Sequence, residues 1–178
     1  RDAIYMFDPE KNELGDLLFE HDEVDVNGLI MSDAQKKLIG VSYFNEYPQH
    51  HFFDPAEASI YEGLQAAFPG MTVSIVSNSK DEKLSILLVG SDRDPGSYFL
   101  YDHKSGSARY LVAPMQWIDP NKMSSMEPIL FTARDGMKIP GYLTLPKSMK
   151  DGEMVPLIVN PHGGPFGVRD FWGYNPEH

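Results

Sequence analysis

A repeated spacing of 46 to 48 residues between similar turns is the feature that most restricts how this chain can fold. Two segments, residues 4–19 and 98–112, each contain an aromatic run, a polar turn that begins with Asp, and a second apolar run. Because an Asp side chain can accept hydrogen bonds from its own turn, each segment predicts a β-hairpin. The turn residues Asp8, Asp54 and Asp102 follow one another at intervals of 46 and 48 residues. The chain is therefore expected to contain repeated β-rich units.

A second pair of segments repeats at the same interval. Residues 32–39 and 78–85 both carry a polar turn that leads into a β-rich run, and Leu38 and Leu84 lie 46 residues apart. A repeat of roughly 40 to 50 residues is typical of the four-stranded blades of a β-propeller. A β-sandwich with evenly spaced hairpins is the alternative. Because two registers agree, we favour the propeller. Since about four blades are needed to close a ring, we expect further blades before Arg1.

One segment departs from the β pattern. Asp54, Pro55 and Glu57 match the N-cap, N1 and N3 positions of a helix. The apolar positions that follow recur at helical spacing: Ile60, Leu64, Ala67 and Phe68. The Pro69-Gly70 pair ends this pattern, so a short helix is predicted inside the repeat, with its apolar side used for packing.

Composition excludes several classes of protein. The chain has 178 residues, of which 42% are hydrophobic, and such a share of apolar residues argues against a disordered chain. Its net charge of −11 argues against nucleic acid as the main partner, because phosphates are neutralised by clustered Lys and Arg. There is no Cys for a disulfide or thiolate site, and no apolar run approaches a membrane span of roughly 20 residues. The sequence predicts no cofactor, metal, nucleic-acid or membrane partner.

The pattern changes after Pro114. Residues 127–132 and 138–146 are two strand-forming runs around a turn at Gly136, which predicts another hairpin. The aliphatic run of residues 155–159 suits a strand buried on both faces of a sheet. It leads directly into residues 160–165, with the sequence Asn-Pro-His-Gly-Gly-Pro.

A glycine pair at the end of a buried strand has a specific chemical use. A hydrolase that attacks an ester or amide stabilises the oxyanion with preorganised N–H donors, and α/β-hydrolases take one donor from the loop after the third strand. Gly163 and Gly164 match such a loop. Pro165 has no N–H, so the donor must be a glycine or the side chain of His162. A plain tight turn is the alternative for the isolated motif.

No catalytic triad is evident in the sequence. The chain contains no Gly-x-Ser-x-Gly nucleophile motif, and in this fold the nucleophile, the acid and the histidine all follow the oxyanion loop. We do not assign a triad to Asp119, to residues 124–125 or to the His50-His51 pair. We interpret that histidine pair as part of a strand or loop edge, with metal binding as the less favoured alternative because no third ligand is evident.

Residues 131–136, 139–143 and 157–165 resemble the entry into the catalytic domain of the prolyl oligopeptidase family of serine peptidases. The His-Gly-Gly-Pro sequence is similar to the acylaminoacyl-peptidase-like branch, and residues 169–174 continue the likeness. Residues 91–98 and the helix after Asp54 are similar to propeller segments of that family. The resemblance implies a Ser-Asp-His hydrolase of short peptides in which a propeller precedes the catalytic domain. It implies that Gly164 gives an oxyanion N–H, while His162 stands where other branches place a Tyr.

These observations give one organisation. We expect a mainly β chain with the last two to three propeller blades in residues 1–118 and the first strands of an α/β-hydrolase domain in residues 119–178. His162, Gly163 and Gly164 are the predicted site residues, in an oxyanion-hole loop. We expect the chain to be a piece of the peptidase that is inactive alone, with open sheet edges that permit self-association. A propeller binding module and an esterase of the same fold are the alternatives.

Overall fold

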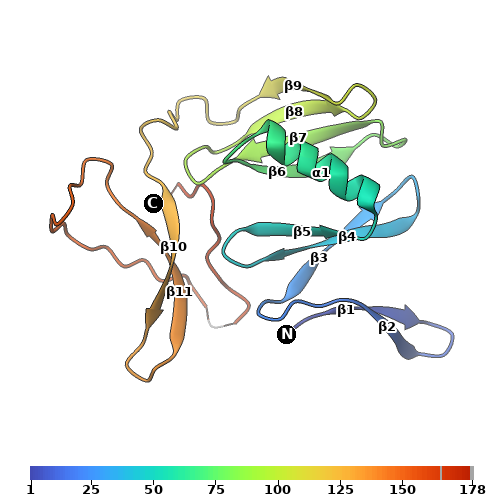
Figure 1. Cartoon of the computed structure of the whole chain (residues 1–178), viewed down its shortest axis with the longest axis horizontal. Coiled ribbons are helices and arrows are strands. Elements are labelled where there is room, and N and C mark those ends of the chain that lie inside the picture. The colour runs from blue at the N-terminus through green and yellow to red at the C-terminus, as the bar shows by residue number, and fades with distance from the viewer. Residues whose placement is uncertain (165, 177–178) are drawn as a thin grey trace.

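The computed structural model describes residues 1–164 and 166–176 and is mainly β, with one short helix (Figure 1). The elements in the described residues are β1 (Ile4–Asp8), β2 (Glu13–Phe19), β3 (Val26–Ser32), β4 (Lys37–Phe44), β5 (Pro48–Phe52), α1 (Pro55–Ala67), β6 (Thr72–Asn78), β7 (Leu84–Gly90), β8 (Ser97–Asp102), β9 (Ser107–Val112), β10 (Met126–Thr132) and β11 (Lys138–Thr144). Among these residues, no helix is long and apolar enough to cross a bilayer.

The strands form four separate antiparallel sheets. Their orders are β1-β2, β3-β4-β5, β6-β7-β8-β9 and β10-β11. Figure 1 shows the first three sheets following one another from the bottom of the view to the top, while the β10–β11 hairpin stands to one side. Each sheet connects only strands that are neighbours in sequence, as the predicted hairpins require.

The Asp-anchored turns are confirmed. Asp8 Oδ1 accepts hydrogen bonds from the backbone N–H groups of residues 10 and 11, at 3.0 and 3.1 Å. Asp102 Oδ1 accepts from residues 104 and 105 in the same way, at 2.8 and 3.2 Å. The first turn joins β1 to β2 and the second joins β8 to β9.

The second repeat also has a structural counterpart. Lys36 and Glu82, 46 residues apart, occupy equivalent places in the β3–β4 and β6–β7 turns, and both have left-handed backbones with φ of 54° and 52°. Glu82 also connects the two turns directly, because its carboxylate accepts from Ser32 Oγ at 2.7 Å and from the Ala34 N–H at 3.2 Å. The repeated segments are therefore equivalent turns in neighbouring sheets.

Helix α1 comes directly after β5, the third strand of its sheet. In the four-stranded sheet the corresponding place, after the third strand β8, is taken by the strand β9. Asp54 is the N-cap, with its side chain accepting from the Ala56 N–H at 2.9 Å, and Pro55 is the first helical residue. The helix ends at Ala67, before the Pro69-Gly70 pair, so the sequence prediction for this helix is confirmed. The Asp that anchors a hairpin turn in the other units caps a helix in this one.

The main core lies between α1 and the four-stranded sheet. Leu64 of α1 packs with Val73 of β6, Leu87 and Val89 of β7, and Tyr101 of β8. Along β7, the side chains of Ser85, Leu87 and Val89 are buried, which is the alternation expected of a strand with one face against a core. The apolar side of the helix is therefore used for packing, as the sequence predicts.

The prediction of a strand at residues 155–159 is wrong. Residues 153–164 contain no helix or strand, and Leu157, Ile158 and Val159 are 78%, 88% and 75% exposed. An apolar run becomes a strand only where a neighbouring strand supplies its hydrogen bonds, and none of the described strands pairs with this run. The hairpin predicted before it is confirmed, with β10 at 126–132 and β11 at 138–144.

Candidate functional site

The predicted oxyanion loop lies in an exposed, irregular part of the chain. His162, Gly163 and Gly164 are all exposed. An ideal Cβ at either glycine would meet no other described atom within 4 Å. The backbone around these glycines is therefore open to another molecule or chain segment. Pro165 lies outside the described residues.

His162 has one side-chain partner in the described structure. Its Nδ1 atom lies 3.0 Å from Asp170 Oδ2, and both side chains are about half exposed. A carboxylate on one ring nitrogen fixes the orientation of an imidazole and favours the proton on that nitrogen. His162 is thus connected to the segment that follows the glycines, and the contact shapes the loop.

Arg169, the residue before Asp170, anchors this segment to the end of β4. The Arg169 guanidinium donates to the Phe44 and Asn45 carbonyl oxygens at 2.8 and 2.7 Å, at the end of β4. Its central carbon also lies 5.3 Å from the ring centre of Phe44 and 5.4 Å from that of Phe171. These cation–π contacts and bidentate hydrogen bonds use the planar geometry of Arg, which Lys cannot reproduce.

Residues 172 and 174 add further contacts between this segment and the β sheets. Trp172 Nε1 donates to the Met126 carbonyl at 2.8 Å, and the Tyr174 N–H donates to the Ser91 carbonyl at 2.9 Å. The Met126 N–H in turn donates to Asp92, whose side chain is only 7% exposed, at 2.7 Å. Residues 169–174, here named the junction segment, therefore contact the β4–β5 hairpin, the start of β10 and the loop after β7.

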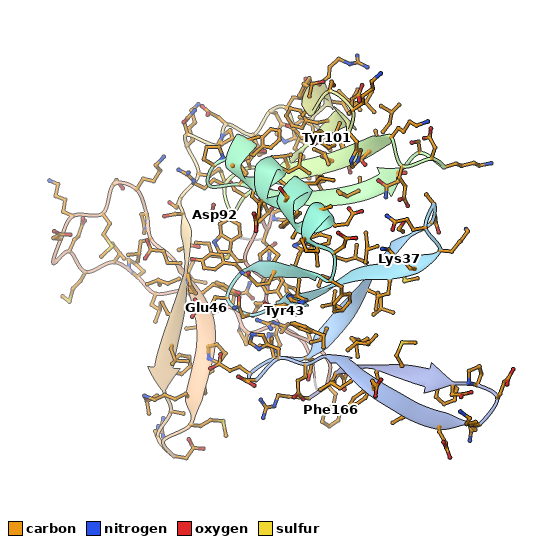
Figure 2. All side chains as sticks on the ribbon, turned by 45° about the vertical axis from the view of Figure 1, so that its right-hand side comes forward. Lys37, Tyr43, Glu46, Asp92, Tyr101 and Phe166 are labelled. Carbon is orange, nitrogen blue, oxygen red and sulfur yellow. The ribbon has the colours of Figure 1, made fainter. Side chains whose placement is uncertain are left out.

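The β10–β11 hairpin also contacts the β4–β5 connection. Tyr142 Oη donates to the Glu46 carbonyl at 2.8 Å. Figure 2 shows Glu46 beside this hairpin, far along the chain from Tyr142. The residues before and after the glycine loop are thus both anchored to the β4–β5 turn of the three-stranded sheet.

We predict that Arg169→Met lowers the free energy of unfolding by about 1 to 2 kcal/mol, because two charge-assisted hydrogen bonds are lost at a partly solvated site. Urea unfolding measures the change. Arg134→Met, in the exposed β10–β11 turn, is the matched control and is expected to change stability by less than about 0.5 kcal/mol. Equal losses for the two variants would show that Arg169 does not anchor the junction segment.

The histidine pair of β5 has two different environments. His50 is half-buried and its ring lies 4.6 Å from that of Tyr61 on α1, whereas His51 is exposed and stacks on Phe19 at 4.6 Å. Burial lowers the pKa of the His50 imidazole below its ordinary 6.5 and raises the pKa of Tyr61 to about 12. The prediction that the pair belongs to a strand is confirmed.

The lowered pKa of His50 gives a pH dependence with a defined sign. The unfolded chain takes up a proton at His50 near pH 6.5, whereas the folded chain does so only at lower pH. Stability should therefore fall as the pH drops from 6.5 toward the folded-state pKa, while the Tyr61 hydroxyl facing the ring stays protonated. His50→Phe should lose part of the stability difference between about pH 7.5 and 5.5, and His51→Phe should keep it. If His50→Phe responds to pH as the unmodified chain does, His50 is not the group responsible.

A serine–histidine contact occurs elsewhere, at a place the sequence does not suggest. Ser85 Oγ lies 2.7 Å from His103 Nε2 and donates to Asn78 at 2.6 Å. Ser85 is only 1% exposed, in the middle of a sheet, so no substrate carbonyl can reach its hydroxyl. This pair supports the β6–β7 and β8–β9 turns and is not a nucleophile with its base.

Two curated proteins are similar to this chain, whereas no family model matches it. Dipeptidyl aminopeptidase BIII of Pseudoxanthomonas mexicana is 30% identical over 164 residues, which is 89% of this chain and 24% of that protein. Dipeptidyl peptidase family member 6 of Caenorhabditis elegans is 23% identical over 189 residues, which is 95% of this chain and 25% of that protein. Both relatives are peptidases by name. The peptidase interpretation of the sequence is supported at that level, and the chain spans about a quarter of the length of each relative.

Proposed function

We propose that this chain is the part of a serine peptidase of the prolyl oligopeptidase family in which a β-propeller meets an α/β-hydrolase domain. The observation that carries the proposal is the similarity to two dipeptidyl peptidases along nearly the whole chain. A propeller binding module whose additional hairpin has no catalytic role would not be expected to resemble two peptidases along this length. The names of both relatives favour the release of dipeptides over acylaminoacyl cleavage.

The arrangement of sheets supports this division of the chain. In residues 1–118, β6–β9 have the order of a complete four-stranded blade, β3–β5 with α1 correspond to a blade with a helix in the last position, and β1–β2 correspond to the outer hairpin of another. Residues 119–178 would begin the hydrolase domain with the β10–β11 hairpin.

The glycine loop would contribute to acyl transfer by electrostatics. When a nucleophile adds to the scissile carbonyl, that oxygen becomes negative, and the Gly164 N–H would donate a hydrogen bond to it. His162, held by Asp170 at 3.0 Å, would shape the loop so that this N–H points at the oxyanion. The nucleophilic serine and the other two triad residues would lie outside residues 1–178.

The proposal is tested with the longer protein, meaning the full product of the gene that encodes this chain. That protein should release 4-nitroaniline from a dipeptidyl 4-nitroanilide with a free N-terminus, and much more slowly from the N-acetylated compound. The 178-residue chain alone should release none. Hydrolysis of 4-nitrophenyl acetate without any amide hydrolysis would favour the esterase alternative, and no hydrolysis of any of the three by the longer protein would refute the proposal.

A further inference from the structure

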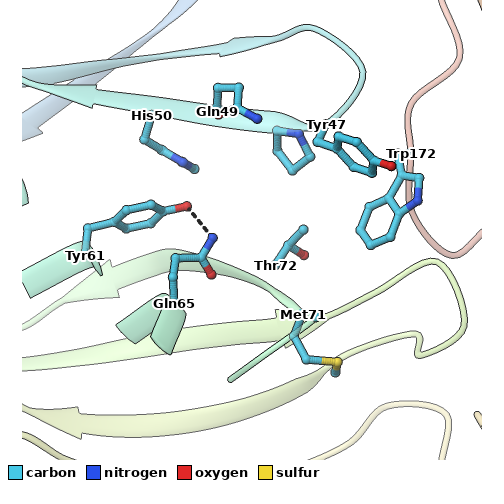
Figure 3. Close-up of a pocket in the computed structure, with 10 residues that line it drawn as sticks. Tyr47, Gln49, His50, Tyr61, Gln65, Met71, Thr72 and Trp172 are labelled. Atoms are coloured by element: carbon cyan, nitrogen blue, oxygen red, sulfur yellow. Dashed lines mark hydrogen bonds between the residues drawn. The ribbon is translucent and has the colours of Figure 1, made fainter. Parts of the chain in front are cut away.

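A pocket lies away from the glycine loop, between β5, α1 and the start of β6 (Figure 3). Its volume is about 390 Å³, enough for a small molecule. His50 and Tyr47 line the side formed by β5 and the turn before it, Tyr61 and Gln65 line the side of α1, and Trp172 stands at one end. The pocket is therefore bounded by two sheets, a helix and the junction segment.

Two buried polar atoms at this pocket lack partners in the protein. His50 Nδ1 and Gln65 Oε1 are both buried, and neither forms a hydrogen bond with any residue in 1–164 or 166–176. The other end of the Gln65 amide donates from Nε2 to Tyr61 Oη at 3.3 Å, which fixes how the side chain is turned. Figure 3 shows His50 and Gln65 extending from opposite walls into the same space. Since buried polar atoms are normally paired, this space has the hydrogen-bonding groups of a binding site.

The surroundings of these atoms are uncharged. The lining residues described for this pocket include no Asp, Glu, Lys or Arg. Burial keeps the pKa of His50 low and that of Tyr61 near 12, so both side chains are neutral at pH 7. A charged ligand would lose its hydration without gaining a counter-charge. The pocket therefore selects an uncharged molecule.

The walls of the pocket favour a ligand that carries a flat apolar group beside its polar group. The Tyr61 ring lies 4.6 Å from the His50 ring, and the Tyr47 ring lies 5.3 Å from Trp172 in an edge-to-face arrangement. Aromatic walls bind a planar ring through stacked or edge contacts. Gln65 Oε1 can only accept a hydrogen bond, so the polar group of the ligand must donate one.

We propose that this pocket binds an uncharged aromatic carboxamide, with the amide N–H donating to Gln65 Oε1 and the carbonyl accepting from His50 Nδ1–H. A carboxamide is planar, neutral, and carries donor and acceptor side by side, which matches the two unpaired atoms. A carboxylate has no donor for Gln65. This site does not depend on the proposed peptidase activity, because none of the residues that form it belongs to the glycine loop.

The test uses the 178-residue chain and benzamide as the probe. Binding is followed by saturation-transfer NMR and by Trp fluorescence in the Trp117→Phe variant, in which Trp172 at the pocket is the one remaining tryptophan. We expect benzamide to bind with a dissociation constant of about a millimolar, as suits so small a ligand. Benzoate and benzyl alcohol should bind at least about tenfold more weakly.

Variants then locate the site. Gln65→Leu should weaken benzamide binding about tenfold by removing the acceptor, and His50→Phe should do the same by removing the donor. Gln35→Leu, at an exposed glutamine in the β3–β4 turn, is the matched control and should bind as the unmodified chain does. If benzamide does not bind, or benzoate or benzyl alcohol binds equally well, the assignment is wrong. Unchanged binding by folded Gln65→Leu would also overturn it, and the ligand comparison decides the question even if a variant fails to fold.

Discussion

Leu87→Ala is expected to lower the free energy of unfolding by about 3 kcal/mol. Leu87 is 0% exposed and lies in β7, between β6 and β8, where its side chain belongs to the core shared with Leu64 of α1. Truncation removes apolar contacts and leaves a cavity that four strands and a helix cannot easily fill. Urea unfolding measures the loss.

The control for this prediction is on the same strand. Leu84→Ala removes the same atoms from a side chain that is 40% exposed, and it should cost less than about 1 kcal/mol. If the two variants lose the same stability, α1 and the four-stranded sheet do not enclose a common core in solution. The helix would then be a loosely attached insertion.

If the longer protein is the peptidase we propose, Gly164→Pro is expected to lower its kcat by roughly 10² to 10³, with little change in KM. Proline has no backbone N–H, so the variant removes the hydrogen bond proposed to stabilise the oxyanion, which forms only in the transition state. Steady-state hydrolysis of the dipeptidyl 4-nitroanilide gives both constants.

Gly164→Ala is the matched control because it keeps the N–H. An ideal Cβ at Gly164 meets no described atom within 4 Å, so this variant should keep activity within about tenfold of the unmodified enzyme. A Gly164→Pro enzyme with normal kcat would exclude the Gly164 N–H from the oxyanion hole. Equal losses in both variants would indicate a steric role for the glycine.

Local features of the fold could be predicted from the sequence because their causes are local. An Asp at a turn accepts hydrogen bonds from the N–H groups two and three residues later, as Asp8 and Asp102 do. The Asp54-Pro55 pair specifies a helix start through the cap and the fixed φ of proline. The interval of 46 residues is matched by turns with the same backbone at Lys36 and Glu82.

Other features depend on partners distant in sequence. The apolar run at 155–159 has the composition of a buried strand, but pairing decides whether a strand forms, and the described residues provide none. Within the candidate site, the glycine loop could be found from its sequence. The role of Arg169 could not, because its hydrogen-bond acceptors are 124 and 125 residues away and no local pattern indicates such a contact. The pocket beside His50 was missed for the same reason.

We propose that residues 1–178 supply an oxyanion loop to a serine peptidase whose nucleophile lies elsewhere in the same protein. Labelling with a fluorophosphonate, followed by mass spectrometry of the modified peptide, tests this most directly. We expect the longer protein to be labelled at a single serine outside residues 1–178, and the 178-residue chain to remain unlabelled. A labelled serine within residues 1–178, or a longer protein that takes up no label, would contradict it.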